Sequence, residues 1–226
     1  MSENLRIFLR IKPSNPSKSP FSLINSQTLL IPPNKNYSFD QIFPNSGSQK
    51  ALFLITAKPL IKPFLSGYNC SYFVNGQTGT GKTYSMGLLK KLNIEGNEEN
   101  NGIIPQFLRN LFEEIEQNNE KNEVFMSFFQ IYCDEIRDLL NPEAKGLIIQ
   151  EKKENNETFI RDLIETPIKS LEEAYKMINA GLVFRKIASQ VTEKLYFLIK
   201  IIRKSIKLHR EVIQFSRFIR RKSIIP

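Results

Sequence analysis

The hydrophobic and polar positions of the chain predict strands that alternate with helices. Residues 5–12 alternate and are rich in branched and aromatic side chains, which is typical of a strand, and this strand should stop at Pro13. Two continuous apolar runs, at 70–74 and 123–132, are typical of strands buried on both faces of a sheet. Further strand-like pieces lie at 22–31, 37–43, 147–151 and 159–164, and the last two predict a hairpin.

Helical spacing of apolar residues predicts the elements between these strands. A helix is expected at 48–65, bent or broken at Pro59 and Pro63, and another at 104–116. Ser170 can cap a helix that Gly181 should stop, and DEIRDLL at 134–140 predicts a short helix. Strands that alternate with helices indicate an α/β sandwich around a central sheet.

Composition is that of an ordinary soluble domain. The chain has 226 residues with 41% apolar content, and it shows no signal-peptide pattern and no apolar run of membrane-spanning length. We therefore expect a soluble, intracellular protein. Two distant cysteines, Cys70 and Cys133, make neither a metal set nor a disulfide framework and should be buried thiols.

The net charge of +9 is concentrated at the end of the chain. Residues 191–226 hold ten Lys or Arg against two acids, whereas the first 190 residues are almost balanced. Any binding of a polyanion or membrane surface would therefore involve this tail, and no specific nucleic-acid binding is expected. Its apolar residues fit helical spacing, which suits a membrane-surface helix, but YFLIKII also reads as a strand. A frame-shifted or mis-spliced end without a selected function is a third alternative.

One glycine-rich segment carries candidate chemistry. It follows the apolar run at 70–74 and fits the phosphate-loop pattern G-x-x-x-x-G-K-[ST] with Gly76, Gln77, Thr78, Gly79, Thr80, Gly81, Lys82 and Thr83. The glycines allow backbone N–H groups to approach phosphate oxygens, and the start of the next helix should favour an anion. Lys82 would place a charge between the outer phosphates, and the Thr83 hydroxyl would be a ligand for Mg²⁺.

Hydrolysis requires further groups beyond a phosphate grip. A second acid usually holds the metal through water, and Asp134 with Glu135 at the end of an apolar run is one candidate. The alternative is that these two acids open the helix that follows, where negative charge is favourable.

Several ordered motifs resemble the kinesin motor domain family. NGQTGTGKTYSM is similar to its phosphate loop, YSFDQIF to its F-x-F-D-x-V-F string, and GIIPQFLRNLF to its G-I-I-P-R helix. FFQIYCDEIRDLLNP is similar to E-I-Y-x-E-x-I-x-D-L-L, in which the acid opens a helix and binds no metal. The resemblance runs from about Leu5 to Ser189.

The resemblance implies a kinesin-like P-loop NTPase fold, a mixed central sheet with helices on both faces, incomplete at its C-terminal end. It places a motor-like domain at 5–190 and a basic divergent tail at 191–226. It also implies an adenine pocket with Arg10, Pro13 and Tyr84, where Lys12 replaces the second Arg of R-x-R-P. The cofactors would be ATP and Mg²⁺. The partner would be tubulin in cytoplasmic microtubules, approached by the loop around Lys152 and Lys153.

Two later motifs of the family, N-x-x-S-S-R-S-H and D-L-A-G-S-E, do not occur in the sequence. ASQVTEKLYFLIKI resembles the family segment on either side of the first motif, as if the cluster were cut out between Lys194 and Leu195. No catalytic residue is therefore identified, and whether the chain is an ATPase stays open. Two functions remain: a microtubule motor domain by descent with impaired turnover, or a fragment that binds nucleotide or tubulin without stepping.

Overall fold

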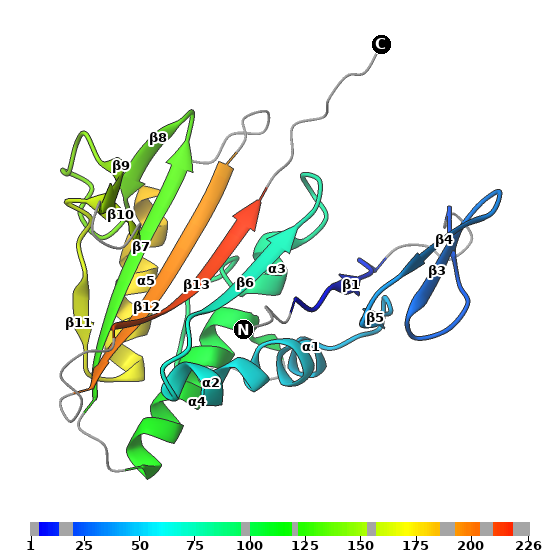
Figure 1. Ribbon diagram of the computed structural model, residues 1–226, viewed down its shortest axis with the longest axis horizontal. Helices are drawn as coiled ribbons and strands as arrows, with labels where there is room; N and C mark the ends of the chain where they lie inside the picture. The colour runs from blue at the N-terminus through cyan, green and yellow to red at the C-terminus, as the bar shows by residue number, and fades with distance from the viewer. Residues whose placement is uncertain are drawn as a thin grey trace.

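The computed structural model describes residues 5–13, 20–95, 100–118, 122–152, 157–185, 193–203 and 210–218. Its centre is a mixed sheet. From one edge to the other, the strand order is β11 (Thr166–Ile168), β7 (Asn122–Tyr132), β12 (Glu193–Arg203), β13 (Arg210–Phe218) and β6 (Cys70–Asn75). A further strand, β8 (Glu135–Asp138), also pairs with β7. Figure 1 shows β12 and β13 between β7 and β6.

The tail is built into this sheet as strands. β12 is antiparallel to β7 over its whole length, with Phe197 opposite Phe128, and β13 runs antiparallel to β12 and parallel to β6. Residues 193–203 are therefore a strand, as one reading of YFLIKII predicted, and the helix considered for this segment is wrong. Alternate side chains of β12 explain the outcome, because Phe197, Ile199 and Ile201 are all buried in the core.

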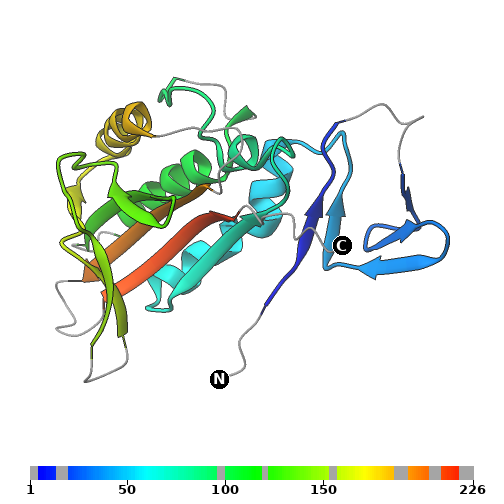
Figure 2. The same cartoon turned by 90° about the horizontal axis from the view of Figure 1, so that it is seen from above.

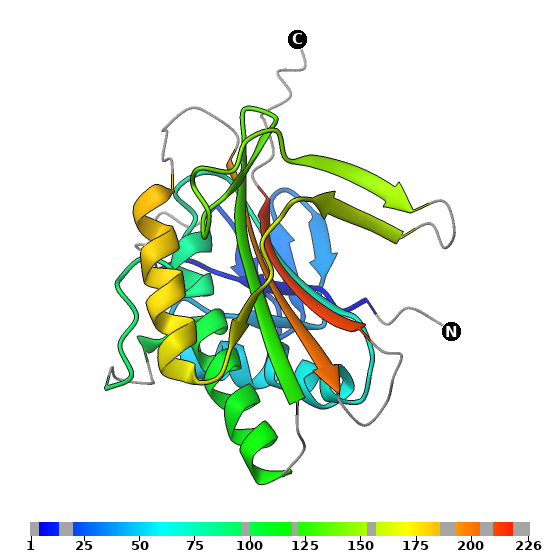
Figure 3. The same cartoon turned by 90° about the vertical axis from the view of Figure 1, so that its left-hand side faces the viewer.

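The described helices form one layer that gathers around α4 (Ile103–Gln117). This helix contacts α1 (Gln49–Thr56), α2 (Ile61–Leu65), α3 (Lys82–Met86) and α5 (Leu171–Phe184). Figures 2 and 3 show α4 and α5 on the same side of the sheet. The second helical layer that the resemblance implied is not found among the described residues.

Local sequence signals explain most helix boundaries. Ser48 caps α1 by accepting from the Ala51 N–H, and Ser170 caps α5 by accepting from the Glu173 N–H at 3.2 Å. The predicted break in 48–65 is confirmed, since α1 is followed by a 3₁₀ turn, η2 (Lys58–Leu60), that contains Pro59. Gly181 does not stop α5. It lies inside the helix, where an added Cβ would be 2.6 Å from Phe128 Cδ1, so it permits close packing on β7.

The predicted helix at 134–140 is wrong, because residues 135–138 of this segment form β8. Tyr132 pairs with Glu135 across a two-residue turn in which Cys133 and Asp134 have φ of 50° and 63°. Positive φ at both central residues matches the tight turns that join twisted antiparallel strands. Cys133 is exposed on this turn, against expectation, whereas Cys70 is buried as predicted.

The expectation for residues 70–74 also needs correction. β6 is the edge strand of the described sheet, and its side chains alternate between partly or fully buried and exposed, with Phe73 51% exposed. β7 does fit its prediction, since residues 126–130 are all buried.

Smaller sheets flank the central one. β1 (Phe8–Arg10) runs parallel to β5 (Gln41–Phe43), and a three-stranded sheet holds β2 (Ser22–Leu23), β3 (Thr28–Ile31) and β4 (Lys35–Ser38). The predicted hairpin is confirmed as β9 (Ile148–Lys152) paired with β10 (Glu157–Arg161). Figure 3 shows this hairpin projecting on the side away from α4 and α5.

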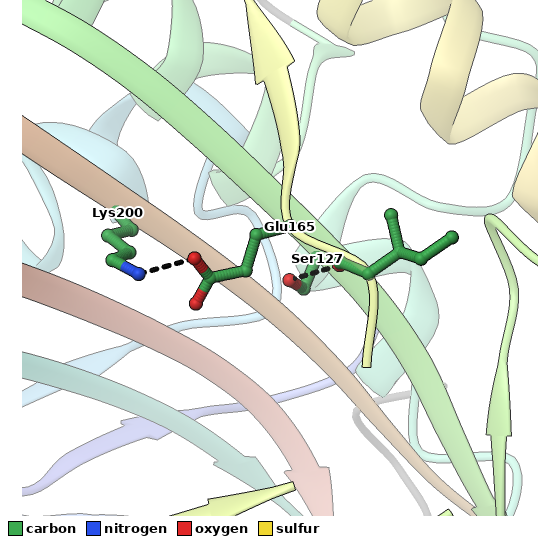
Figure 4. Close-up of polar contacts among 4 residues, drawn as sticks. Ser127, Glu165 and Lys200 are labelled. Carbon is green, nitrogen blue, oxygen red and sulfur yellow. Dashed lines mark hydrogen bonds and ion pairs between the residues drawn. The ribbon is translucent and has the colours of Figure 1, made fainter. Parts of the chain in front are cut away.

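Polar contacts tie the connection between β10 and β11 to the sheet. Ser127 Oγ donates to the Ile164 carbonyl at 2.7 Å, and the Lys200 ammonium is paired with the Glu165 carboxylate (Figure 4). The neighbouring Asp138 is buried and accepts from the backbone N–H groups of Leu140, Asn141 and Ile164. These contacts hold the segment just before β11 against β7, β8 and β12.

Candidate phosphate-binding site

The glycine-rich loop connects β6 to α3, as a phosphate loop does. Gly79 and Gly81 have φ of +83° and +94°, a conformation that other residues rarely adopt. At both positions, a Cβ built on the backbone meets no atom within 4 Å. The backbone at these two positions suits glycine, and the space beside it is open. A phosphate oxygen therefore has room to approach the backbone N–H groups of the loop.

Lys82 is 3% exposed, and its ammonium lies on the loop itself. Its Nζ donates to the Gly76 carbonyl at 2.7 Å and to the Gln77 carbonyl at 2.5 Å. The Gln77 carbonyl also accepts from the Thr80 N–H at 3.3 Å and the Thr80 hydroxyl at 2.8 Å. The loop carbonyls thus hold the buried Lys82 ammonium at the loop, where an anion would be bound.

Thr83 is half-buried in the first turn of α3, next to Lys82. Mg²⁺ takes oxygen ligands, and the Thr83 hydroxyl supplies one, so the residue fits the predicted role as a metal ligand. Among the residues that the structure describes, no group of three or more His, Cys, Asp or Glu side chains could hold a metal ion. Since α3 has only five residues, its helix dipole adds little to an anion site, contrary to the sequence-based expectation.

Arg10 points into the protein. Its Nη1 donates to Gln49 Oε1 at 2.6 Å and to Ser85 Oγ at 2.9 Å, and its guanidinium lies 5.1 Å from the centre of the Tyr84 ring. Burial lowers the pKa of Arg10 below its usual value, and the nearby Tyr84 opposes that shift. Arg10 therefore holds α3 and the Tyr84 ring in place.

Tyr84 and Pro13 both remain accessible. Tyr84 is 43% exposed on α3, and Pro13 is exposed after β1. Their roles at an adenine base stay predictions, as does the role of Arg10 there. Of the loop predicted to face tubulin, Lys153 and the Lys152 side chain lie outside the described residues.

Sequence patterns missed the polar residues that support this region. Gln49 is buried on α1 and donates from Nε2 to the Tyr84 carbonyl at 2.6 Å, while Gln106 on α4 donates to the Gln49 carbonyl. Lys12 donates from Nζ to the Gly79 carbonyl at 2.8 Å. Only Lys12 had a signal in the sequence, as the residue in place of the second Arg of R-x-R-P.

Comparisons with known proteins agree on one family. The family model for the kinesin motor domain matches residues 14–195 of this chain. The kinesin-like protein Klp61F of Drosophila melanogaster is 28% identical over 205 residues, which cover 83% of this chain and 19% of that protein. The chain thus spans about a fifth of the length of this curated relative.

Solved structures share the fold. The structure of a fast kinesin superposes with a TM-score of 0.82 at 22% identity and covers 98% of this chain and 68% of its own. The Drosophila kinesin family member Kin10/NOD, in complex with divalent manganese and ADP, gives 0.78 at 23% identity, over 97% of this chain and 72% of its own. The predicted α/β P-loop fold class is confirmed, whereas the division at residue 190 stays a prediction. The chain belongs to the kinesin motor domain family.

Proposed function

We propose that this chain binds ATP with Mg²⁺ on the loop Gly76–Thr83. The observation that carries the proposal is the loop itself, with open space beside Gly79 and Gly81 and the buried Lys82 ammonium on its carbonyls. Lys82 would move from these carbonyls to the outer phosphates. Thr83 would hold the metal, which supplies charge neutralisation for the phosphates.

The proposed base contact lies on α3, one residue after Thr83. Tyr84 offers an exposed aromatic face, and Arg10 stabilises the ring position from within the protein. Stacking of adenine on this ring fits the chemistry of tyrosine, and Pro13, three residues after β1, would line the same pocket. The similar protein bound to manganese and ADP supports a nucleotide with a divalent metal as the ligand class.

The proposed turnover of ATP is close to background. Neither N-x-x-S-S-R-S-H nor D-L-A-G-S-E occurs in the 226 residues. In the family, these two motifs supply the groups that sense the terminal phosphate, so this sequence does not provide those groups through them. A missing preorganised group costs about two to three orders of magnitude in rate. We therefore propose a motor domain by descent with impaired hydrolysis.

A radiolabelled ATPase assay of the purified chain tests this proposal, with and without microtubules. The expected result is a rate within about tenfold of the buffer blank, unchanged by microtubules. Microtubule-stimulated turnover that Lys82→Ala abolishes would show instead that the chain is a working motor ATPase.

A tubulin-binding module is the second candidate. The hairpin of β9 and β10 carries Ile148 and Ile149 as exposed apolar side chains. By resemblance to the family, the loop around Lys152 and Lys153 that joins its strands would face tubulin. Binding to microtubules would localise the chain to the cytoskeleton. Co-sedimentation with microtubules in the absence of turnover supports this module. Failure to pellet at tubulin concentrations of about 10 μM would remove it.

A further inference from the structure

β1 is held beside the phosphate loop by hydrogen bonds, although it lies outside the central sheet. The strand pairs with β5, the Ile11 N–H donates to the Phe43 carbonyl at 2.9 Å, and Arg10 is bonded to α1 and α3. Lys12 follows two residues after Arg10. Its backbone is therefore tied, through Arg10, to α1 and to α3, the helix that follows the loop.

Two lysine ammonium groups, those of Lys82 and Lys12, donate hydrogen bonds to different carbonyls of the loop. The buried Lys82 donates to the carbonyls of Gly76 and Gln77, whereas Lys12, in the segment after β1, donates to the Gly79 carbonyl. When Lys82 moves to a phosphate, the Gly76 carbonyl loses this donor. The contact between Lys12 and Gly79 does not depend on that movement, so it can persist in both states.

The geometry points to Lys12 as a positioning residue that holds the turn Gln77–Thr80 while Lys82 moves between the loop carbonyls and the bound phosphate. This inference rests on the proposed nucleotide function and adds a residue to it. Lys12 acts through the Gly79 carbonyl, at a position where glycine has a positive φ and few steric restraints on its motion. A hydrogen bond from a charged donor suits this task, because it is stronger than a neutral one.

Hydrogen exchange in the nucleotide-free chain tests the positioning directly. In Lys12→Gln, amide exchange in a peptide that covers residues 76–83 should be about fivefold faster than in the original chain, and Lys12→Arg should restore slow exchange. Lys91→Gln is the matched control, because Lys91 is an exposed lysine after α3. Unchanged exchange in Lys12→Gln would overturn the inference.

Calorimetric titration with ADP and Mg²⁺ gives the functional result. Lys12→Gln should weaken ADP about fivefold, Lys12→Arg should stay within about twofold of the original chain, and the melting temperatures should agree. Equal ADP affinity in Lys12→Gln and the original chain would also overturn it. If the original chain binds no ADP, the proposed function fails, and the exchange experiment still decides whether Lys12 positions the loop.

Discussion

Gly87, at the end of α3, and Gly102, before α4, touch backbone to backbone. A Cβ added to Gly102 would lie 2.2 Å from the Gly87 nitrogen, and a Cβ added to Gly87 would lie 2.9 Å from the Gly102 nitrogen. No side chain can be accommodated there without moving one of the two segments. This contact places the helix after the phosphate loop directly on the central helix of the core.

Replacement of Gly102 by alanine should therefore destabilise the protein by about 3 kcal/mol, the upper end of the cost of overpacking. Urea unfolding measures the loss. Gly47→Ala is the control, because its added Cβ would be 3.1 Å from a single carbonyl oxygen, and we expect a loss below about 1 kcal/mol. Equal stability of the two variants would show that the segments separate easily.

Asp138 should be the most sensitive acid in the described part of the chain. Its carboxylate is 2% exposed and accepts three backbone N–H groups, including Ile164 at 3.0 Å. Asp138→Ala leaves these donors without their acceptor and should cost about 2 kcal/mol in unfolding free energy. The exposed Glu172, which pairs with Lys176 on α5, should cost less than about 0.5 kcal/mol when changed to alanine. Similar losses for the two variants would contradict this account.

The pair of Lys200 and Glu165 should respond asymmetrically to substitution. The Lys200 side chain is 12% exposed and that of Glu165 is 50% exposed. Glu165→Gln leaves a mostly buried ammonium without its counter-charge, whereas Lys200→Met removes the buried charge itself. We expect the first variant to be less stable than the second, with a coupling of about 1 kcal/mol in a double-mutant cycle. Additive effects would argue against a direct pair.

The two cysteines should differ in reactivity. Burial raises the pKa of the Cys70 thiol, so less of the reactive thiolate forms, while Cys133 is exposed on the turn between β7 and β8. At about pH 8, Ellman's reagent should modify one thiol rapidly and the second only in denaturant. Cys133→Ser should remove the fast phase. A fast phase that survives this substitution would place an accessible thiol at Cys70.

The sequence predicted correctly those boundaries and turns that a single capping residue, proline or glycine determines. Ser170 marked the start of α5, and Pro59 marked the break after α1. The phosphate loop was also readable, because its glycine positions are dictated by backbone geometry. These features depend on residues that are close together in the sequence.

The errors concern features that distant residues decide. The apolar residues of β12 fit both a helix and a strand, and pairing with β7, more than sixty positions away, selected the strand. The inward orientation of Arg10 also depends on distant residues, because Gln49 and Ser85, 39 and 75 positions away, accept its hydrogen bonds, while its role at an adenine base stays a prediction. The acids at 134–135 looked like a helix start, but the turn at Cys133 and Asp134 reversed the chain.

Titration calorimetry with ATP and Mg²⁺ tests the central claim most directly, comparing the original chain with Lys82→Ala. If the loop grips phosphate through Lys82, the original chain binds one nucleotide, and the variant, checked for folding by its circular dichroism and melting, loses at least about tenfold in affinity. An original chain that binds no nucleotide, or a folded Lys82→Ala that binds equally well, would contradict the account.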